Sequence, residues 1–247
     1  MRWLEQTWTD LDELDRQRTV VMLPVGAIEA HGPHLPLGTD GVISTAMAER
    51  TVARLGSHGL HCLILPCLDF TAAEFARNFP GTLSFRPSTV VAILQDLTAG
   101  LAAQGWRMLA VANSHLDPTH LACLRDGLAD SPIPVAYPDL TRRRYAERLT
   151  AEFQTGACHA GQYEGSIVMA ARPELVRSEI ARELADNPAS LVTAIREGKQ
   201  TFEQAGGPRA YFGTPAGASA QEGEATLEAL ADILVEAILG ALPADTP

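Results

Sequence analysis

One loop of the sequence brings together residue types that bind metal ions. Residues 26–40 read GAIEAHGPHLPLGTD, with two glycines and two prolines between Glu29 and Asp40. Glu29 and His31 are two positions apart, so in extended backbone their side chains point the same way. Imidazole nitrogen together with carboxylate oxygen suits zinc or manganese, and the loop has no thiolate for a closed structural zinc site. The loop therefore predicts that Glu29, His31 and Asp40 are metal ligands, although Asp40 also stands where a helix N-cap is expected.

A second segment repeats this pairing of a carboxylate with an imidazole. Residues 112–121 read ANSHLDPTHL, in which Asp117 follows two positions after His115. Two such pairs can meet around two divalent ions that share a carboxylate, which lowers the pKa of a bound water to about 7 and polarises a carbonyl group. We therefore expect His115 and Asp117 to be further metal ligands. His120, on the helix that follows, is expected to pack or to face solvent.

A third segment carries a candidate acid–base residue. Residues 158–166 read CHAGQYEGS, where His159 lies among small residues that permit close approach of a substrate. An imidazole that titrates near the working pH can donate a proton to a leaving nitrogen, so His159 is the candidate catalytic residue. Glu164, at the start of the next helix, is explained equally well by the positive end of the helix dipole.

Short apolar runs alternate with longer helical patterns, and this order predicts a mostly parallel sheet covered by helices on both faces. The run at 19–27, TVVMLPVGA, is apolar almost throughout, as a strand buried on both faces must be. Further strands are predicted at 60–68, 106–112 and 133–140, and helices at 41–56, 87–105, 118–130, 141–153, 173–205 and 226–242. Because ligands of such sheets gather at the carboxyl ends of the strands, the loops after 19–27 and 106–112 are where a site is expected.

Composition limits the class of protein. The chain has 247 residues, 46% of them hydrophobic, which is enough for a sizeable core, and we find no repeat or linker that would divide it. A net charge of −11 argues against nucleic acid as a partner, and no apolar run approaches the roughly 20 residues that cross a membrane. The N-terminus lacks the order of a signal peptide, and the four cysteines lack metal-ligand spacing. We therefore expect a cytoplasmic single domain over residues 1–247 that acts on a small molecule.

With these segments in this order, the chain resembles the creatininase family, also called creatinine amidohydrolases. The blocks that carry the resemblance are PVGAIEAHGPHLPLGTD, NFPGTLSFRPST, NSHLD, HAGQYEGS, ARPELV and GTPAGASAQEG. The resemblance implies a three-layer α/β/α fold, two zinc or manganese ions per chain and a homohexamer. It also implies that Glu29 and His115 bind one ion and His31 the other, that Asp40 bridges the two, and that His159 is the catalytic acid or base.

The chain departs from the family pattern at positions that bear on metal and substrate. Family members often supply a metal-binding Glu three residues after the HAG histidine, where this chain has Gln162. Creatininases themselves place a Glu two residues after the metal-binding His, and here Asp117 occupies that position, so the resemblance makes Asp117 the candidate for completing the second metal site. Leu116 and Thr155 stand where creatininases have aromatic residues, which indicates a divergent member that acts on something other than creatinine.

The substrate pocket is expected where the resemblance is weakest. Its wall should come from residues 70–79 and 205–220. The surrounding Gly- and Pro-rich segment, residues 205–223, is too long for a simple turn and reads as a surface or lid-like piece.

The residues and the resemblance together predict a metal-dependent amidohydrolase. It would use a metal-activated water to hydrolyse the C–N bond of a cyclic amide, a formamide or a small peptide. Two alternatives remain: a hydrolase that opens a keto-inositol or lactone ring, and a non-catalytic metal-binding homologue. Two ions per chain would favour an enzyme, whereas one or none would favour the binding protein.

Overall fold

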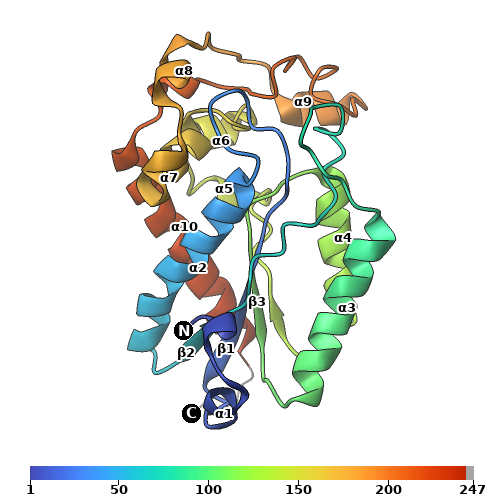
Figure 1. The fold of residues 1–247 in the computed structure, drawn as a ribbon, viewed down its shortest axis with the longest axis vertical. Coiled ribbons are helices and arrows are strands. Elements are labelled where there is room, and N and C mark those ends of the chain that lie inside the picture. The colour runs from blue at the N-terminus through green and yellow to red at the C-terminus, as the bar shows by residue number, and fades with distance from the viewer. Residues whose placement is uncertain (243–247) are drawn as a thin grey trace.

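A parallel β-sheet runs through the middle of the computed structural model, which describes residues 1–242 (Figure 1). Within that part of the chain the strands follow the order β2-β1-β3-β4, with β1 at Thr19–Val25, β2 at His61–Ile64, β3 at Leu109–Asn113 and β4 at Val135–Ala136. Each strand is parallel to its neighbours. The last part of the predicted domain, residues 243–247, lies outside the described residues.

Helices cover both faces of the sheet, and Figure 1 shows them as two groups on either side of the strands. One group consists of α2 (Thr39–Ser57), α7 (Gln162–Ala171) and α10 (Ala220–Ala241). The other consists of α3 (Pro87–Ala103) and α4 (Pro118–Leu128). This arrangement confirms the predicted three-layer α/β/α fold with a parallel central sheet.

Strand β1 shows why an unbroken apolar run is needed here. All of its residues are buried. Val20 and Met22 pack into the core that includes α2 and α10, whereas Val21 and Leu23 pack into the core that includes α3 and α4. Because successive side chains of a strand point to opposite faces, one strand contributes to two cores at once.

Shorter elements lie beyond the carboxyl ends of the strands, and Figure 1 shows α6, α8 and α9 at the top of the molecule. They are α5 (Arg143–Ala146), α6 (Ala151–Thr155), α8 (Ser178–Glu183), α9 (Leu191–Arg196) and 3-10 helices at Pro173–Leu175 and Pro215–Gly217. A third apolar cluster, which contains Phe75, Phe202 and Phe212, packs with Ala194 of α9, whereas Tyr145 of α5 and Phe153 of α6 belong to the core that includes α2 and α10. A 3-10 helix (Trp3–Glu5) and α1 (Trp8–Asp12) precede β1.

Two predicted helices are broken into shorter pieces. The helix expected at 141–153 is divided into α5 and α6, and Thr150 caps α6 by accepting the backbone N–H of Phe153. In the described chain, the helical stretch expected at 173–205 holds only a 3-10 turn, α8 and α9. Pro188 lies between the last two and has no N–H with which to continue a helix. The prediction of continuous helices was wrong at both places.

The segment 205–223 lies only partly at the surface that its glycines and prolines suggested. Ala210 and Phe212 are buried, and the N–H of Phe212 donates to the carbonyl oxygen of His159 at 2.8 Å. The last residues of the segment, from Ala220 onward, belong to α10. The expectation failed for the residues around Phe212, because Phe212 supplies apolar area to the third cluster, while Pro208, Arg209 and Ala216 remain exposed.

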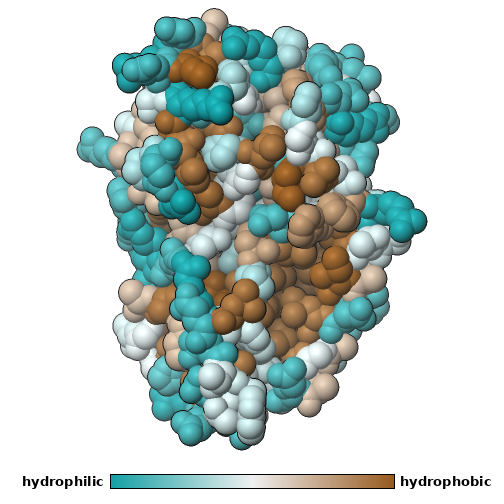
Figure 2. Space-filling model, viewed as in Figure 1, coloured by the Kyte–Doolittle hydropathy of each residue, from teal (hydrophilic) through white to brown (hydrophobic). Residues whose placement is uncertain are grey.

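Part of the surface remains apolar. Figure 2 shows apolar residues gathered in a hollow on the face beside α3. Large apolar residues that stay exposed include Phe70, Leu83 and Ile93. None of the helices in residues 1–242 combines the length and the hydropathy that a membrane span requires.

Candidate metal centre

The pairing of β1 with β3 places the two ligand-bearing loops side by side. Val25, the last residue of β1, is in register with Asn113, the last residue of β3. Parallel strands end at the same edge of a sheet, and ligands gather there. The loop that carries Glu29 and His31 therefore begins beside the loop that carries His115.

Asp40 reaches the same edge from the first turn of α2. The N-cap of α2 is Gly38, so Asp40 is not the cap residue that the sequence also allowed. A Cβ at Gly26 would lie 2.4 Å from the backbone nitrogen of Gly41, so glycine at position 26 lets α2 approach the end of β1 this closely. Oγ of Ser114 donates to the carbonyl oxygen of Asp40 at 2.7 Å and fastens this turn to the end of β3.

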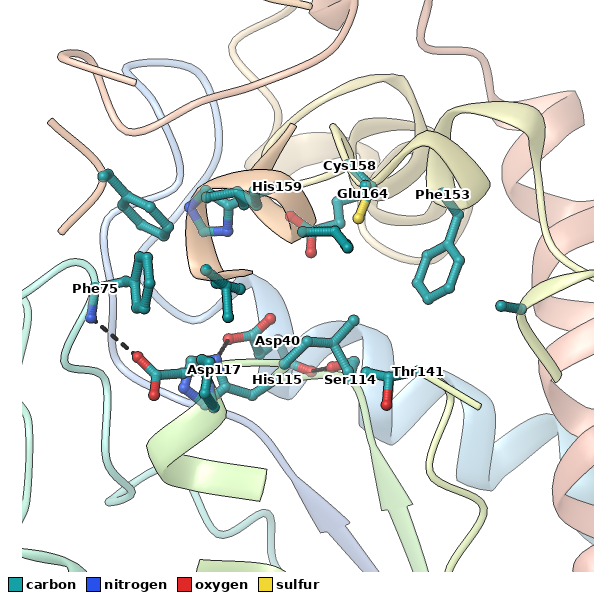
Figure 3. A pocket seen from close by; sticks show the side chains of 18 of the residues that line it. Asp40, Phe75, Ser114, His115, Asp117, Thr141, Phe153, Cys158, His159 and Glu164 are labelled. Atoms are coloured by element: carbon teal, nitrogen blue, oxygen red, sulfur yellow. Dashed lines mark hydrogen bonds and ion pairs between the residues drawn. The ribbon is translucent and has the colours of Figure 1, made fainter. Parts of the chain in front are cut away.

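Four of the predicted ligands form one buried cluster, part of which is drawn in Figure 3. Nδ1 of His115 lies 3.1 Å from Oδ2 of Asp40 and 3.4 Å from Oε1 of Glu29. Nε2 of His31 lies 3.5 Å from Oδ1 of Asp40 and 3.7 Å from Oε1 of Glu29. Asp40 thus faces one imidazole with each of its oxygens.

Backbone carbonyls fix which ring nitrogen of each histidine faces the cluster. The contacts are His31 Nδ1 to the Glu29 carbonyl at 3.1 Å, His115 Nε2 to the Ala72 carbonyl at 2.8 Å and His159 Nε2 to the Ala30 carbonyl at 2.9 Å. A carbonyl oxygen only accepts hydrogen bonds, so these nitrogens carry the proton and the other ring nitrogen keeps a lone pair when the ring is neutral. Histidines that bind metal ions are held in this way.

Glu164 also belongs to the cluster, although the sequence left its role open between the site and the helix dipole. It lies in the first turn of α7, and its Oε2 is 3.5 Å from Nε2 of His31. Ala160 has a φ of 51°, and its N–H donates to Oε2 of Glu164 at 2.7 Å. A left-handed conformation is strained for a residue with a side chain, and such strain is typical of functional sites. The feature of the sequence that could have identified Glu164 is its position five residues after His159.

Asp117 is engaged outside the cluster. It is the N-cap of α4, where its Oδ1 accepts the N–H of Thr119 at 2.7 Å. Its Oδ2 accepts the N–H of Phe75 at 2.9 Å. The structure therefore directs both oxygens of Asp117 to backbone donors, and it does not place Asp117 in any group of candidate ligands found in residues 1–242.

The residues present fit divalent cations. The candidate ligand groups found in residues 1–242 overlap, and they are Glu29 with Asp40 and His115, His31 with Asp40 and Glu164, and Glu29 with His31 and His159. Within the same residues, buried Oε2 of Glu29 and Nε2 of His31 have no hydrogen-bond partner. A buried polar atom without a partner is destabilising, and a cation held by these groups would satisfy both atoms.

The charged groups of the cluster shift one another's pKa values. Burial by itself lowers the pKa of His31, but the carboxylates of Asp40, Glu164 and Glu29 raise this pKa to about 10. Burial raises the pKa of Glu164 to about 8, although the positive charge of His31 lowers it. Without a cation, protons must therefore balance the buried carboxylates.

His159 lies over the cluster between two other rings. Its ring centroid is 4.3 Å from that of His31 and 4.2 Å from that of Phe202. Its Nδ1 lies 3.7 Å from Oε1 of Glu29. Burial, together with the positive charge of His31, holds the pKa of His159 well below its usual value. The ring is therefore neutral near pH 7, and its Nδ1 offers a lone pair toward the cluster.

Two polar residues near the cluster have partners away from it. Nε2 of Gln162 donates to Oε2 of Glu222 at 2.6 Å, which ties α7 to α10. His120 is buried beside His115, and its Nε2 lies 2.8 Å from Oδ1 of Asn113. His120 thus packs behind the site, as one of the two expected possibilities had it.

A cavity of about 290 Å³ opens beside the cluster. Figure 3 shows His159, Asp40 and His115 toward one end, with Phe153 and Thr141 at the other. Residues 70–79 contribute Phe75 to the lining, but 205–220 contribute no residue, and the apolar side chains of that segment such as Phe212 belong to the third apolar cluster. The expectation for 205–220 was therefore wrong, and the wall comes instead from residues within 114–118, 141–158 and 191–202.

The fold and this cluster define an α/β protein with a candidate metal centre at the carboxyl ends of its parallel strands. The family model described as creatinine amidohydrolase matches residues 4–238. The chain therefore belongs to the creatininase family, a family of hydrolases.

Relatives with different named activities resemble this chain over most of its length. Creatinine amidohydrolase of Pseudomonas putida is 29% identical over 192 residues, which cover 70% of this chain and 72% of the relative. The mycofactocin precursor peptide peptidase of Mycobacterium tuberculosis is 28% identical over 229 residues, which cover 90% of this chain and 86% of the relative. A solved structure named "Creatininase Mn" matches with a TM-score of 0.75 at 24% identity, over 98% of each chain. This last likeness shows a shared fold.

Proposed function

We propose that the protein is a metal-dependent hydrolase that cleaves the C–N bond of a small amide. The observation that carries the proposal is that two candidate ligand groups share Asp40: one contains Glu29 and His115, the other His31 and Glu164. Two cation sites with a common carboxylate are the arrangement of two-metal hydrolytic centres.

The donor atoms support zinc or manganese as the bound ions. Carboxylate oxygens and imidazole nitrogens without a thiolate suit both metals. Glu29 and His115 would hold the first ion, and His31 and Glu164 the second, with Asp40 between them. Glu164 thus takes the place that the sequence alone gave to Asp117, and the manganese in the name of a solved relative agrees with this donor set.

The chemistry divides between the ions and the protein. When bound, the ions would polarise the amide carbonyl and lower the pKa of a water molecule to about 7. Nδ1 of His159 has a lone pair and is placed to accept the proton of the attacking water and to pass it to the leaving nitrogen. The carbonyl of Ala30 and the ring of Phe202 hold the imidazole in the orientation that this transfer needs.

The names of the relatives support an amide bond as the target. An amidohydrolase and a peptidase both cleave a bond between carbon and nitrogen, and the chain is 29% and 28% identical to one of each. Leu116 lines the cavity at a position where creatininases are expected to have an aromatic ring. We therefore propose an amide other than creatinine as the substrate.

Metal content per chain tests the ligand assignment. Elemental analysis of protein purified without chelator should give about two zinc or manganese ions per chain. Glu164→Gln should reduce this to about one, because it removes a ligand of the second ion. Asp117→Asn should retain both ions, because Asp117 faces backbone donors. Glu174→Gln is the control, since Glu174 is an exposed carboxylate paired with Arg172, and it should also retain both.

Turnover completes the test. Hydrolysis in a screen of amides should stop when metal is chelated, and His159→Ala should lower kcat by at least about 100-fold while metal content stays constant. One ion or none in the unaltered protein would contradict the two-ion proposal. Two ions without turnover of any amide would favour a metal-binding protein, and loss of metal in His159→Ala would assign His159 to the ligands instead.

A further inference from the structure

Much of the cavity wall outside the metal-ligand cluster is apolar. The residues that make it so are Leu116, Phe153, Leu191, Val192 and Ile195. They come from three parts of the chain, the loop after β3, helix α6 and helix α9. Val192 and Ile195 are 43% and 37% exposed, so helix α9 offers the cavity apolar surface that a ligand can cover.

The polar side chains of this wall are already engaged within the protein. Oγ1 of Thr141 donates to Oδ1 of Asp139 at 2.5 Å. Nε2 of Gln154 donates to the carbonyl oxygen of Leu149 at 2.9 Å. The wall therefore holds these groups in internal hydrogen bonds, and the metal-ligand cluster is the polar end of the cavity.

Within residues 1–242, the lining has no permanently cationic side chain. Among the described residues, no lysine or arginine lines the cavity, whereas the carboxylates of Glu29, Asp40, Asp117 and Glu164 do. A ligand carboxylate placed against α9 would lose hydration without meeting a cation, which is strongly unfavourable. An ammonium group would meet no free carboxylate of residues 1–242 there either, because Asp117 faces backbone donors and the other three carboxylates belong to the cluster, so the apolar wall disfavours a group of either charge.

We propose that the substrate is a small uncharged amide that carries a branched aliphatic or aromatic group. This inference rests on the proposed function, because the amide carbonyl must lie at the metal-ligand cluster. The apolar group then extends toward Phe153 and α9, where its burial adds to the free energy of binding. The cavity of about 290 Å³ is near the lower limit of the roughly 300–1,000 Å³ of small-molecule pockets, so it suits one amide with one such group.

Hydroxamic acids test the two ends of the cavity separately, because the hydroxamate binds a metal ion and its substituent lies against the wall. The probes are acetohydroxamic acid, phenylacetohydroxamic acid and the monohydroxamate of succinic acid, and the readout is the Kd for zinc-loaded protein by titration calorimetry. We expect the phenyl compound to bind at least about tenfold more tightly than acetohydroxamic acid, because its ring is buried. The succinic compound should bind no more tightly than acetohydroxamic acid.

A matched pair of variants locates the effect. Ile195→Asp should weaken binding of the phenyl compound by about tenfold and leave binding of acetohydroxamic acid unchanged. Ile93→Asp is the control, because Ile93 is 36% exposed, close to the 37% of Ile195, and does not line the cavity. If Ile195→Asp does not fold, Val192→Thr places a hydroxyl in the same wall at nearly constant volume and should act in the same direction.

The outcomes separate this inference from the function on which it rests. Equal affinity for all three hydroxamates, or an equal effect of Ile195→Asp and Ile93→Asp, would overturn the apolar substrate and leave the metal centre intact. Tighter binding of the succinic compound would overturn it as well. Failure of every hydroxamate to bind would contradict the proposed metal centre and this inference with it.

Discussion

The orientation of each buried imidazole in the cluster is fixed by the ring nitrogen that faces away from the carboxylates, because that nitrogen contacts a backbone carbonyl. His31 presents Nε2 to the carboxylates because its Nδ1 lies against the carbonyl of Glu29, whereas His115 presents Nδ1 because its Nε2 lies against the carbonyl of Ala72. These backbone contacts cost no side-chain freedom elsewhere and leave one nitrogen of each ring for a cation. Main-chain geometry therefore decides which nitrogen of each ring faces the cluster.

Binding of a cation should release protons from these residues. In the metal-free protein burial lowers the pKa of His31, but the carboxylates raise it to about 10, so His31 is protonated at pH 7. A cation needs the lone pair of Nε2, so this proton must leave, and affinity for zinc should rise roughly tenfold per pH unit between pH 6 and 8 for each proton displaced.

Calorimetric titration in two buffers of different ionisation enthalpy measures this release. The observed binding enthalpy should differ between the buffers in proportion to the protons released. Identical enthalpies, together with a Kd that does not change with pH, would show that the metal-free cluster is already deprotonated.

Asp117 should contribute to stability and little to metal binding. Asp117→Ala removes the cap of α4 and leaves the N–H of Phe75 without its acceptor, which should lower the free energy of unfolding by about 1–3 kcal/mol. Each kcal/mol shifts Tm by about 2–4 °C in a protein of this size, and calorimetry resolves such a shift. Asp130→Ala, an exposed site beyond the end of α4, should change Tm little. A large loss of metal with unchanged Tm in Asp117→Ala would restore Asp117 to the ligands.

At the scale of elements, glycines let helices approach closely enough to assemble the site. A Cβ at Gly223 of α10 would lie 1.9 Å from the carbonyl oxygen of Ser166 in α7. Helix α7 carries Glu164 in its first turn, so the packing of α10 against α7 also positions a candidate ligand. Glycine is needed at position 223 because helix α7 lies so close, and not because of the backbone dihedral angles of Gly223 itself.

Gly223→Ala should therefore destabilise the protein although alanine favours helices. Separating α7 from α10 should cost about 1–3 kcal/mol, more than the roughly 1 kcal/mol gained in helix propensity. Gly240→Ala is the matched control in the same helix, because among residues 1–242 nothing outside the local helix backbone lies within 4 Å of a Cβ there, and it should raise stability by about 0.5–1 kcal/mol. Thermal unfolding of both variants gives the comparison, and equal effects would show that α7 and α10 adjust freely.

At the scale of the whole molecule, the site joins segments that are distant in the sequence. Residues from the loops after β1 and β3 and from the first turns of α2 and α7 meet in one cluster. A cation that binds this cluster binds the folded chain and not the unfolded one, so it must stabilise the whole fold. The homohexamer expected from the family resemblance stays a prediction, which sedimentation of the metal-loaded protein would test.

Chelation should lower the thermal stability of the protein. At a metal concentration about 100 times Kd, binding adds about 2.7 kcal/mol to the free energy of unfolding, which corresponds to roughly 5–10 °C in Tm. Scanning fluorimetry with EDTA, and then with excess zinc or manganese, should show the loss and its recovery. Asp40→Asn should respond to neither treatment, and a Tm that ignores EDTA in the unaltered protein would argue against a resident ion.

Much of this molecule could be predicted from local patterns. The apolar run of β1 indicated a strand buried on both faces, and its alternating side chains do enter two cores. The ligand residue types stood in loops after two strands, and the parallel register of Val25 with Asn113 brings those loops together. These features depend on periodicity and on the common edge of parallel strands, and both are visible in one sequence.

Only the tertiary structure decided which further carboxylate joins the cluster. Asp117 and Glu164 each stand at the start of a helix and near a histidine, so their local patterns are alike. Asp117 turns toward the N–H of Phe75, a residue far away in the sequence, whereas Glu164 turns toward His31. The burial of Phe212 within a Gly- and Pro-rich segment has the same origin. Such choices depend on contacts between distant segments, and a local pattern does not contain them.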